Sequence, residues 1–287
     1  MNTRQQTLLA LAAAAGAACL LLRARPDKPR SPGRPGAAAL ITGASSGIGA
    51  AFAWKLAAAG YDLVLVARRA DRLDALAGEL RQRHACAVEV LPADLTVAGD
   101  VERVAGRLAE LPGLDLLINN AGFGVEGRFA QADIGPQLAM IRLHVLASVR
   151  LTHAALPGMT ARGRGGIINV ASLAGFIALP GAVSYCATKG YLITFSRALN
   201  LELTRSGVTV QALCPGLTHT EFHARQRSAS AARLPEFMWM SAEAVVEASL
   251  AGLARGQAVC IPGWGNRVLR RLGSNPLAEL ILPYVSR

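Results

Sequence analysis

The sequence predicts an α/β protein: a single Rossmann-type, doubly wound domain with a parallel sheet of about seven strands. Three observations lead to this fold class. Short apolar segments alternate with helical segments along residues 37–263, which is typical of a parallel sheet with helices on both faces. A glycine-rich segment follows the first apolar segment, and polar residues stand at the ends of several others. Ligands of such sheets bind at those ends, so both features predict a binding site there.

Length and charge limit what the chain can be. Its 287 residues, 52% of them hydrophobic, are enough for one large domain with a sizeable core. The formal net charge of +11 is concentrated at the two ends, in residues 1–36 and 264–287. A nucleic-acid-binding protein usually carries a basic surface on its folded domain. The distribution therefore argues against nucleic acid and favours contact with a membrane surface.

Residues 1–22 form an apolar N-terminal segment. Residues 8–22 contain no polar side chain except that of Cys19, Arg4 precedes them, and basic residues follow from Arg23 onward. As a helix this stretch would reach about 22 Å, against a bilayer core of about 30 Å. We expect a membrane anchor, with a cleavable signal peptide or a frayed extension as the alternatives. The basic residues that follow favour keeping the domain on the cytoplasmic side of the membrane, or in the cytoplasm.

Residues 23–36 form a Pro/Arg-rich linker. Pro26, Pro29, Pro32 and Pro35 recur at every third position. This spacing favours an extended polyproline II spacer, which would separate the leader from the domain of residues 37–263.

The first predicted strand, residues 37–42, leads into a glycine-rich turn and a helix that ends near residue 59. The turn reads Gly43-Ala44-Ser45-Ser46-Gly47-Ile48-Gly49. Glycines at such a turn let the backbone approach a pyrophosphate, which the N-terminus of the helix attracts. We expect a dinucleotide phosphate site here; the alternative is a tight turn without a ligand.

The second predicted strand, residues 62–67, ends in two arginines. A domain that prefers NAD typically places a carboxylate at this point, where it binds the ribose hydroxyls. This chain has Arg68 and Arg69 instead, and the nearest acid is Asp71. Guanidinium groups suit the additional phosphate of NADP, so we predict NADP(H) in preference to NAD(H). The alternative is that both arginines are solvated at the start of a helix.

The remaining elements continue the alternation. Strands are predicted at residues 86–91, 114–118, 166–170, 208–213 and 258–261, and helices at about 101–110, 134–159, 185–205 and 242–254. Polar or turn residues follow the ends of these strands at Asp94, Asn119, Ser172 and Pro215. They should converge at one edge of the sheet with the glycine-rich turn.

Tyr185 and Lys189 lie four residues apart on a predicted helix and therefore share one face of it. A phenol titrates near pH ~10 in water. An ammonium about 4 Å away would favour the phenolate by roughly 4 kcal/mol, which would bring the phenol closer to neutral pH for proton transfer. The alternative is an ordinary helical tyrosine beside a solvated lysine.

Five motifs occur in order along the chain. They are Thr42-Gly43-x-x-x-Gly47-x-Gly49, Asn119-Asn120-Ala121-Gly122, Ser172 placed thirteen residues before Tyr185, Tyr185-x-x-x-Lys189, and Pro215-Gly216. Together they resemble the classical short-chain dehydrogenase/reductase (SDR) family, over about residues 37–263. The resemblance implies an oxidoreductase that transfers a hydride between nicotinamide and a carbonyl or secondary alcohol.

The resemblance also implies a role for each matching residue. Those that would bind the cofactor lie in the glycine-rich turn, after the ends of the later strands and on the helix of Tyr185: Gly43, Ser45, Ser46, Gly47, Ile48, Gly49, Arg68, Asp94, Asn120, Tyr185, Lys189, Pro215, Gly216 and Thr218. Within this set Asp94 would meet the adenine, Arg68 is placed like the residue that selects NADP, and Lys189 would hold the nicotinamide ribose. Ser172 would bind the substrate carbonyl, and Tyr185 would exchange its proton. A carbonyl that accepts hydride develops alkoxide character, so two donors aimed at its oxygen fit the chemistry.

One position departs from the family pattern. The predicted fourth helix carries His144 where the family usually has an asparagine that belongs to a proton relay and keeps a local distortion of the helix. Because imidazole titrates near pH ~6.5, we expect a working relay whose rate falls as His144 becomes protonated. The alternative is a histidine that is simply packed in the helix, with its ring hydrogen-bonded elsewhere.

Two C-terminal regions carry apolar residues outside the regular alternation. Residues 217–240 contain Phe222, Leu234, Phe237, Met238, Trp239 and Met240. We predict a lid over a lipophilic substrate, with a dimer or membrane contact as the alternative. Residues 264–287 form a basic amphipathic tail, which suits a membrane interface or a partner subunit.

These features define one overall prediction: an NADP(H)-dependent reductase or dehydrogenase with a small-molecule carbonyl or alcohol substrate. We also expect the protein to be membrane-associated and a homo-oligomer (dimer or tetramer).

The five cysteines are odd in number and include no C-x-x-C pair, so we expect free thiols, no disulfide framework and no metal site. The alternative function is a catalytically weak or inactive NADP-binding sensor or scaffold of the same fold.

Overall fold

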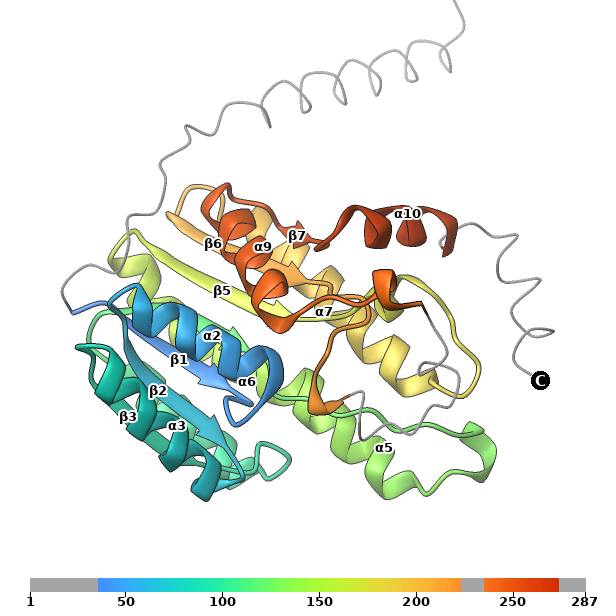
Figure 1. Ribbon diagram of the computed structural model, residues 1–287, viewed down its shortest axis with the longest axis horizontal. Coiled ribbons are helices and arrows are strands. Elements are labelled where there is room, and N and C mark those ends of the chain that lie inside the picture. Colours follow the sequence, from blue (N-terminus) through green and yellow to red (C-terminus); the bar gives the residue numbers. More distant parts are fainter. Residues whose placement is uncertain (1–35, 223–234, 274–287) are drawn as a thin grey trace, which may run out of the picture.

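The computed structural model describes residues 36–222 and 235–273 (Figure 1). The predicted anchor, residues 8–22, lies outside these ranges, as do almost all of the Pro/Arg-rich linker and Leu234 of the predicted lid. Among the residues that are described, no helix combines the length and the apolar character needed to cross a bilayer.

Seven parallel strands form one sheet in the described part of the chain, in the order β3-β2-β1-β4-β5-β6-β7. The strands are β1 (Ala38–Thr42), β2 (Asp62–Ala67), β3 (Val88–Pro92), β4 (Leu114–Asn119), β5 (Gly165–Val170), β6 (Val208–Leu213) and β7 (Val259–Cys260). The prediction of a doubly wound parallel sheet is confirmed. The strand order reverses at β1, which has β2 on one side and β4 on the other, and ligands of such sheets bind at this switch point.

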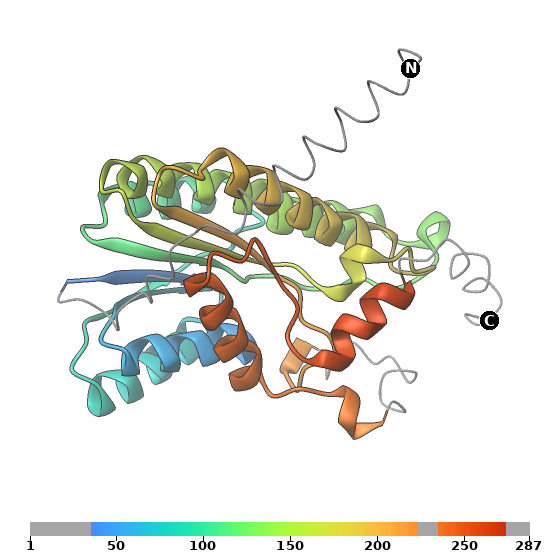
Figure 2. The same cartoon turned by 90° about the horizontal axis from the view of Figure 1, so that it is seen from above.

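Helices cover both faces of the sheet (Figures 1 and 2). One face carries α2 (Gly47–Ala58), α3 (Ala70–Arg83) and α9 (Ala242–Ala254), and the other carries α4 (Ala98–Glu110), α6 (Ser148–Ala161) and α7 (Val183–Glu202). Because both faces are covered, every residue of β1 is buried. This explains why the strand reads as a continuous apolar run rather than an alternating one.

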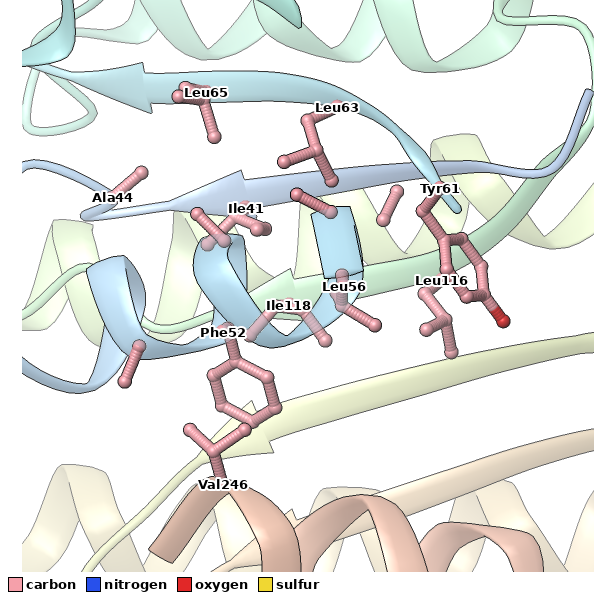
Figure 3. Close-up of a cluster of buried hydrophobic side chains, with 14 of the residues drawn as sticks. Ile41, Ala44, Phe52, Leu56, Tyr61, Leu63, Leu65, Leu116, Ile118 and Val246 are labelled. Carbon is pink, nitrogen blue, oxygen red and sulfur yellow. The ribbon is translucent and has the colours of Figure 1, made fainter. Parts of the chain in front are cut away.

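The core beneath α2 joins the two halves of the sheet. Phe52 of α2 is fully buried and points toward Val246 of α9, near Ile41 and Ile118 of the central strands (Figure 3). Full burial of one such side chain stabilises the fold by roughly 1.5–3 kcal/mol. The packing fixes α2, and with it the glycine-rich turn at its N-terminus, against the central strands.

The helix predicted over residues 134–159 is interrupted. It consists of α5 (Ile134–Ile141), a π-helical turn η2 (Arg142–Ala147) and α6 (Ser148–Ala161). A π turn inside an α-helix is frequently found at a functional site. His144 lies in this turn, so the chain has a local distortion at this position with histidine in place of the usual asparagine.

The start of the basic tail packs against the domain as α10 (Trp264–Gly273). Asn266 is buried and donates a hydrogen bond to the Pro262 carbonyl at 2.8 Å. The Arg270 guanidinium lies 4.8 Å from the ring centroid of Phe176 in the short helix η3 (Leu173–Phe176). The folded unit therefore continues into the tail as far as the described residues reach, with Trp264 exposed on its surface.

Candidate active site

A cleft of about 340 Å³ opens at the carboxyl ends of the strands. Its lining includes thirteen of the fourteen residues that the sequence predicts for cofactor binding, and also Ser172. The two predicted site residues outside the lining are Gly49 and His144. Gly49 and His144 each contact a residue that lines the cleft, Gly43 and Gly122 respectively. The fold therefore brings all of the predicted site residues to the carboxyl ends of the strands.

The glycine-rich turn is shaped for a close ligand. Gly43 and Gly47 have φ angles of 66° and 55°, which residues with a Cβ rarely adopt. A Cβ on Gly49 would lie 2.3 Å from the Gly43 carbonyl oxygen. Glycine at position 49 therefore allows the helix α2 to pack closely against the turn. The first N–H groups of α2 have no partner inside the helix. The turn therefore fits a pyrophosphate by its backbone shape and by the polarity of the helix N-terminus.

Hydrogen bonds tie the turn to the end of β4. The Thr42 hydroxyl accepts from the backbone N–H groups of Asn120, at 2.9 Å, and Ala121, at 3.0 Å. The Asn120 amide donates to the Thr42 carbonyl at 2.9 Å. One residue earlier, Asn119 donates to the Asn169 side chain of β5 at 2.8 Å. Asn120 thus builds part of the wall of the cleft, and Asn119 links the neighbouring strands β4 and β5.

The two arginines after β2 have different surroundings. Arg68 has a side chain 63% exposed, and its Nη1 lies 3.9 Å from an Asp94 oxygen. Arg69 is 28% exposed and donates to the hydroxyls of Ser45 and Ser46, each at 3.0 Å from its Nη2. From the sequence both arginines suit the phosphate of NADP, and the family resemblance assigns cofactor binding to Arg68 alone. The contacts place Arg69 closer to the glycine-rich turn, and only the fold could reveal them.

Ser172, Tyr185 and Lys189 meet at the other end of the cleft. Ser172 follows β5, whereas Tyr185 and Lys189 lie one turn apart on α7. The Ser172 hydroxyl interacts with the phenol of Tyr185 and favours its ionised form. Lys189 is buried and its Nζ donates to the Val170 carbonyl at 2.8 Å. A serine hydroxyl and a phenol thus stand beside a fixed ammonium.

The pKa of Tyr185 corrects one expectation. Burial raises this pKa to about 12, although the interaction with Ser172 acts in the opposite direction. The Lys189 ammonium, which is held by the Val170 carbonyl and lies 5.7 Å from the centroid of the phenol ring, does not offset this effect of burial. Burial also lowers the pKa of Lys189 to about 8. At neutral pH the residues of the chain therefore hold a protonated phenol beside a charged lysine, the form that donates a proton to a carbonyl.

His144 also differs from its prediction. Its Nε2 accepts a hydrogen bond from the Phe123 backbone N–H at 3.3 Å, and its Nδ1 lies 3.0 Å from the Thr188 hydroxyl. The Thr188 hydroxyl in turn donates to the backbone carbonyl of Tyr185 at 3.0 Å. These contacts define a neutral ring with the proton on Nδ1.

Burial and the Lys189 charge hold the pKa of His144 well below its usual range. Protonation of Nε2 would also bring its N–H group against the Phe123 backbone N–H, so that two donors would face each other. The expected titration near pH ~6.5 is therefore wrong for this ring, and its hydrogen bonds match the alternative of a packed histidine. Thr188 was missed by sequence reasoning, because nothing in the sequence pairs it with His144.

The turn after β6 closes the cleft opposite the glycines. A Cβ on Gly216 would lie 2.3 Å from the Asn266 side-chain oxygen of α10, so glycine is required for this packing. The Thr218 hydroxyl donates to the Gly216 carbonyl at 3.1 Å. Further on, the Phe222 ring lies 5.9 Å from the Tyr185 ring, centroid to centroid. Phe222, one of the predicted lid residues, is thus in contact with Tyr185.

The fold and this cleft define a nicotinamide-dinucleotide oxidoreductase. Residues 37–231 match the short chain dehydrogenase family. Nodulation protein G of Rhizobium sp. (strain N33) is 33% identical over 79% of this chain and 93% of its own. The chain belongs to the short-chain dehydrogenase/reductase family. It is accordingly an NAD(P)-dependent enzyme with a small-molecule substrate.

Solved structures agree with this assignment. A short-chain dehydrogenase from Sphingobium yanoikuyae in complex with NADPH is 41% identical, with a TM-score of 0.76, covering 87% of this chain and 95% of its own. The bulky-bulky ketone specific alcohol dehydrogenase from Comamonas testosteroni is 37% identical, with a TM-score of 0.72, covering 83% and 92%.

Proposed function

We propose that this protein is an NADP(H)-dependent carbonyl reductase, or the corresponding alcohol dehydrogenase, for a lipophilic substrate. One observation carries the proposal. Ser172, Tyr185 and the buried Lys189 line the same cleft whose other end holds Arg68 and Arg69. Proton donors and a phosphate-binding end thus share one continuous cavity.

The role proposed for each catalytic residue follows from the contacts. The nicotinamide supplies or accepts the hydride when bound. Ser172 and Tyr185 direct two hydroxyls at the substrate oxygen, where negative charge develops during reduction. Tyr185, protonated at neutral pH, gives its proton to that oxygen, and the Lys189 ammonium stabilises the phenolate that results. For the reverse reaction the same residues act in the opposite order.

The preference for NADP(H) is supported by charge at the end of β2. Arg68 and Arg69 line the cleft and no acid occupies their positions. Guanidinium groups bind phosphate through charge-assisted hydrogen bonds. The related Sphingobium enzyme was solved with NADPH, in agreement with this preference.

The lipophilic substrate is supported by the cleft wall near Tyr185. Phe123, Leu143 and Phe222 line it there. Apolar walls with few polar groups are typical of sites for apolar ligands. The related Comamonas enzyme is specific for bulky-bulky ketones, so ketones with two large apolar substituents are the first compounds to test.

Assembly and location remain part of the proposal. Leu146, Val183 and Tyr191 on the outer surface of η2 and α7 are exposed, which supports a homo-oligomer. The basic residues at both ends of the chain and the exposed Trp264 support association with the cytoplasmic face of a membrane. Light scattering and sedimentation with anionic vesicles would test these two points separately from catalysis.

The experiment that tests the function is a screen of bulky ketones, aldehydes and their alcohols with NADPH and with NADH. We expect oxidation of NADPH with at least one bulky ketone and a higher KM for NADH. An inactive sensor would bind NADPH without consuming it under any of these conditions. Binding without turnover across the whole panel would contradict the proposal.

A further inference from the structure

Glu221 links two ends of the cleft. Its Oε2 lies 2.9 Å from Nη1 of Arg69, and its Oε1 is paired with Arg72. The ring of the next residue, Phe222, is tilted against that of Tyr185, with the two centroids 5.9 Å apart. Two consecutive residues therefore contact the arginine end and the catalytic end of the same cavity.

The chain before Glu221 is fixed at its base. Thr218 forms a bridge with Met240, and the His219 N–H donates to the Met240 carbonyl at 3.0 Å. Thr220 packs over the glycine-rich turn, since a Cβ on Gly47 would lie 3.0 Å from its methyl group. With the base held, the pairing of Glu221 with Arg69 and Arg72 fixes the chain directly before Phe222.

Arg69, one of the two partners of Glu221, lines the cleft and is well placed to meet a phosphate, and Arg72 is paired with the other oxygen of the same carboxylate. Arg69 contacts Ser45 and Ser46 of the glycine-rich turn with one side of its guanidinium and Glu221 with the other. The two arginines hold the pKa of Glu221 below its usual range, so the carboxylate is charged at neutral pH. A phosphate group with nearly two negative charges and three acceptor oxygens competes well with one carboxylate for such guanidinium groups.

We propose that Glu221 is a specificity-determining residue: its carboxylate competes with the 2′-phosphate of NADP(H) for Arg69 and Arg72, and its displacement releases Phe222 from Tyr185. This inference rests on the proposed NADP(H) preference. A nucleotide without the 2′-phosphate leaves Glu221 in place and Phe222 over the catalytic phenol. Glu221 thus couples recognition of the phosphate to access at the catalytic end.

The test uses adenosine 2′,5′-bisphosphate and adenosine 5′-monophosphate as probes, with calorimetry on the full chain. In Glu221→Gln the bisphosphate no longer has to displace a charge, so we expect its Kd to fall about tenfold, or ~1.4 kcal/mol. The Kd of the monophosphate should not change. Glu236→Gln is the matched control, because Glu236 pairs with His219 at 2.9 Å and not with the arginines.

Hydrogen exchange over residues 218–222 provides the second readout. The bisphosphate should accelerate exchange of these amides in the native protein, and the monophosphate should not. In Glu221→Gln exchange should be fast with either probe or with none. Bisphosphate affinity that is unchanged or weaker in Glu221→Gln, or added protection of residues 218–222, would overturn the inference. If the native protein binds both probes equally, the proposed NADP(H) preference fails instead.

Discussion

The Nδ1 atom of His144 lies 3.0 Å from the Thr188 hydroxyl, which joins the π-helical turn η2 to the catalytic helix α7. Thr188 precedes Lys189 and hydrogen-bonds the Tyr185 backbone. The Nε2 atom of the same ring fixes Phe123 beside the cleft. His144 therefore connects the loop after β4 with Tyr185 and Lys189, the residues to which we assign proton transfer in the proposed function.

Because the pKa of His144 lies well below its usual range, its protonation does not limit the rate near neutrality. We expect the rate to show no acid limb from His144 between about pH 5.5 and 7.5, and the same profile shape in His144→Asn. His144→Ala and Thr188→Val should each lower kcat by a similar, pH-independent factor. If the rate of the native protein falls below about pH 6.5 and this fall is absent in His144→Asn, the hypothesis of a proton relay that titrates at His144 would be correct after all.

Arg69→Ala should raise the KM for NADPH more than Arg68→Ala does, with little effect on NADH. Hydrogen bonds to charged groups contribute about 1.5–3 kcal/mol, so we expect roughly a 10- to 100-fold change for Arg69. Steady-state kinetics with both cofactors measures it. Arg164→Ala is the control, because that residue pairs with Asp115 away from the cleft. Equal effects on NADPH and NADH would show that Arg69 does not read the phosphate.

Gly49→Ala should destabilise the protein by about 1–3 kcal/mol, because the new Cβ would lie 2.3 Å from the Gly43 carbonyl oxygen. Gly106→Ala in α4 is the matched control, since its Cβ would meet nothing within 4 Å. That change should stabilise by about 0.4–1 kcal/mol. Urea unfolding of both variants measures the difference. If both changes have the same sign, the close approach of α2 to the turn is not as described.

Tyr185→Phe should lower kcat by about 10²–10⁴-fold, the usual contribution of general acid–base catalysis. The ring and its contacts with His144 and Phe222 remain, so cofactor binding should persist. Fluorescence titration with NADPH checks binding independently of turnover. Activity close to that of the native protein would exclude Tyr185 as the proton donor.

The fold could be predicted from the sequence because the alternation of strands and helices is local. The convergence of Gly43, Asp94, Ser172 and Pro215 at one edge then follows from the geometry of a parallel sheet. Arg69 and Glu221 are different, since they lie 152 positions apart and no periodicity relates them. Their contact depends on how the turn after β6 meets α3.

Electrostatic expectations failed for a physical reason. From the sequence, the spacing of Tyr185 and Lys189 indicates only that an ammonium is near a phenol. It does not indicate how deeply each is buried, and burial dominates both pKa values. The same holds for His144, whose pKa is held well below its usual range by burial and by the Lys189 charge.

The most direct test of the proposed activity is deuterium transfer. NADPH labelled with deuterium at the transferable position of the nicotinamide is incubated with the native protein and a bulky ketone, and the alcohol is analysed by mass spectrometry. We predict one deuterium on the carbinol carbon, and none above background with Tyr185→Phe over the same time. An alcohol without deuterium, or no alcohol from any ketone while NADPH binds, would contradict hydride transfer by this protein.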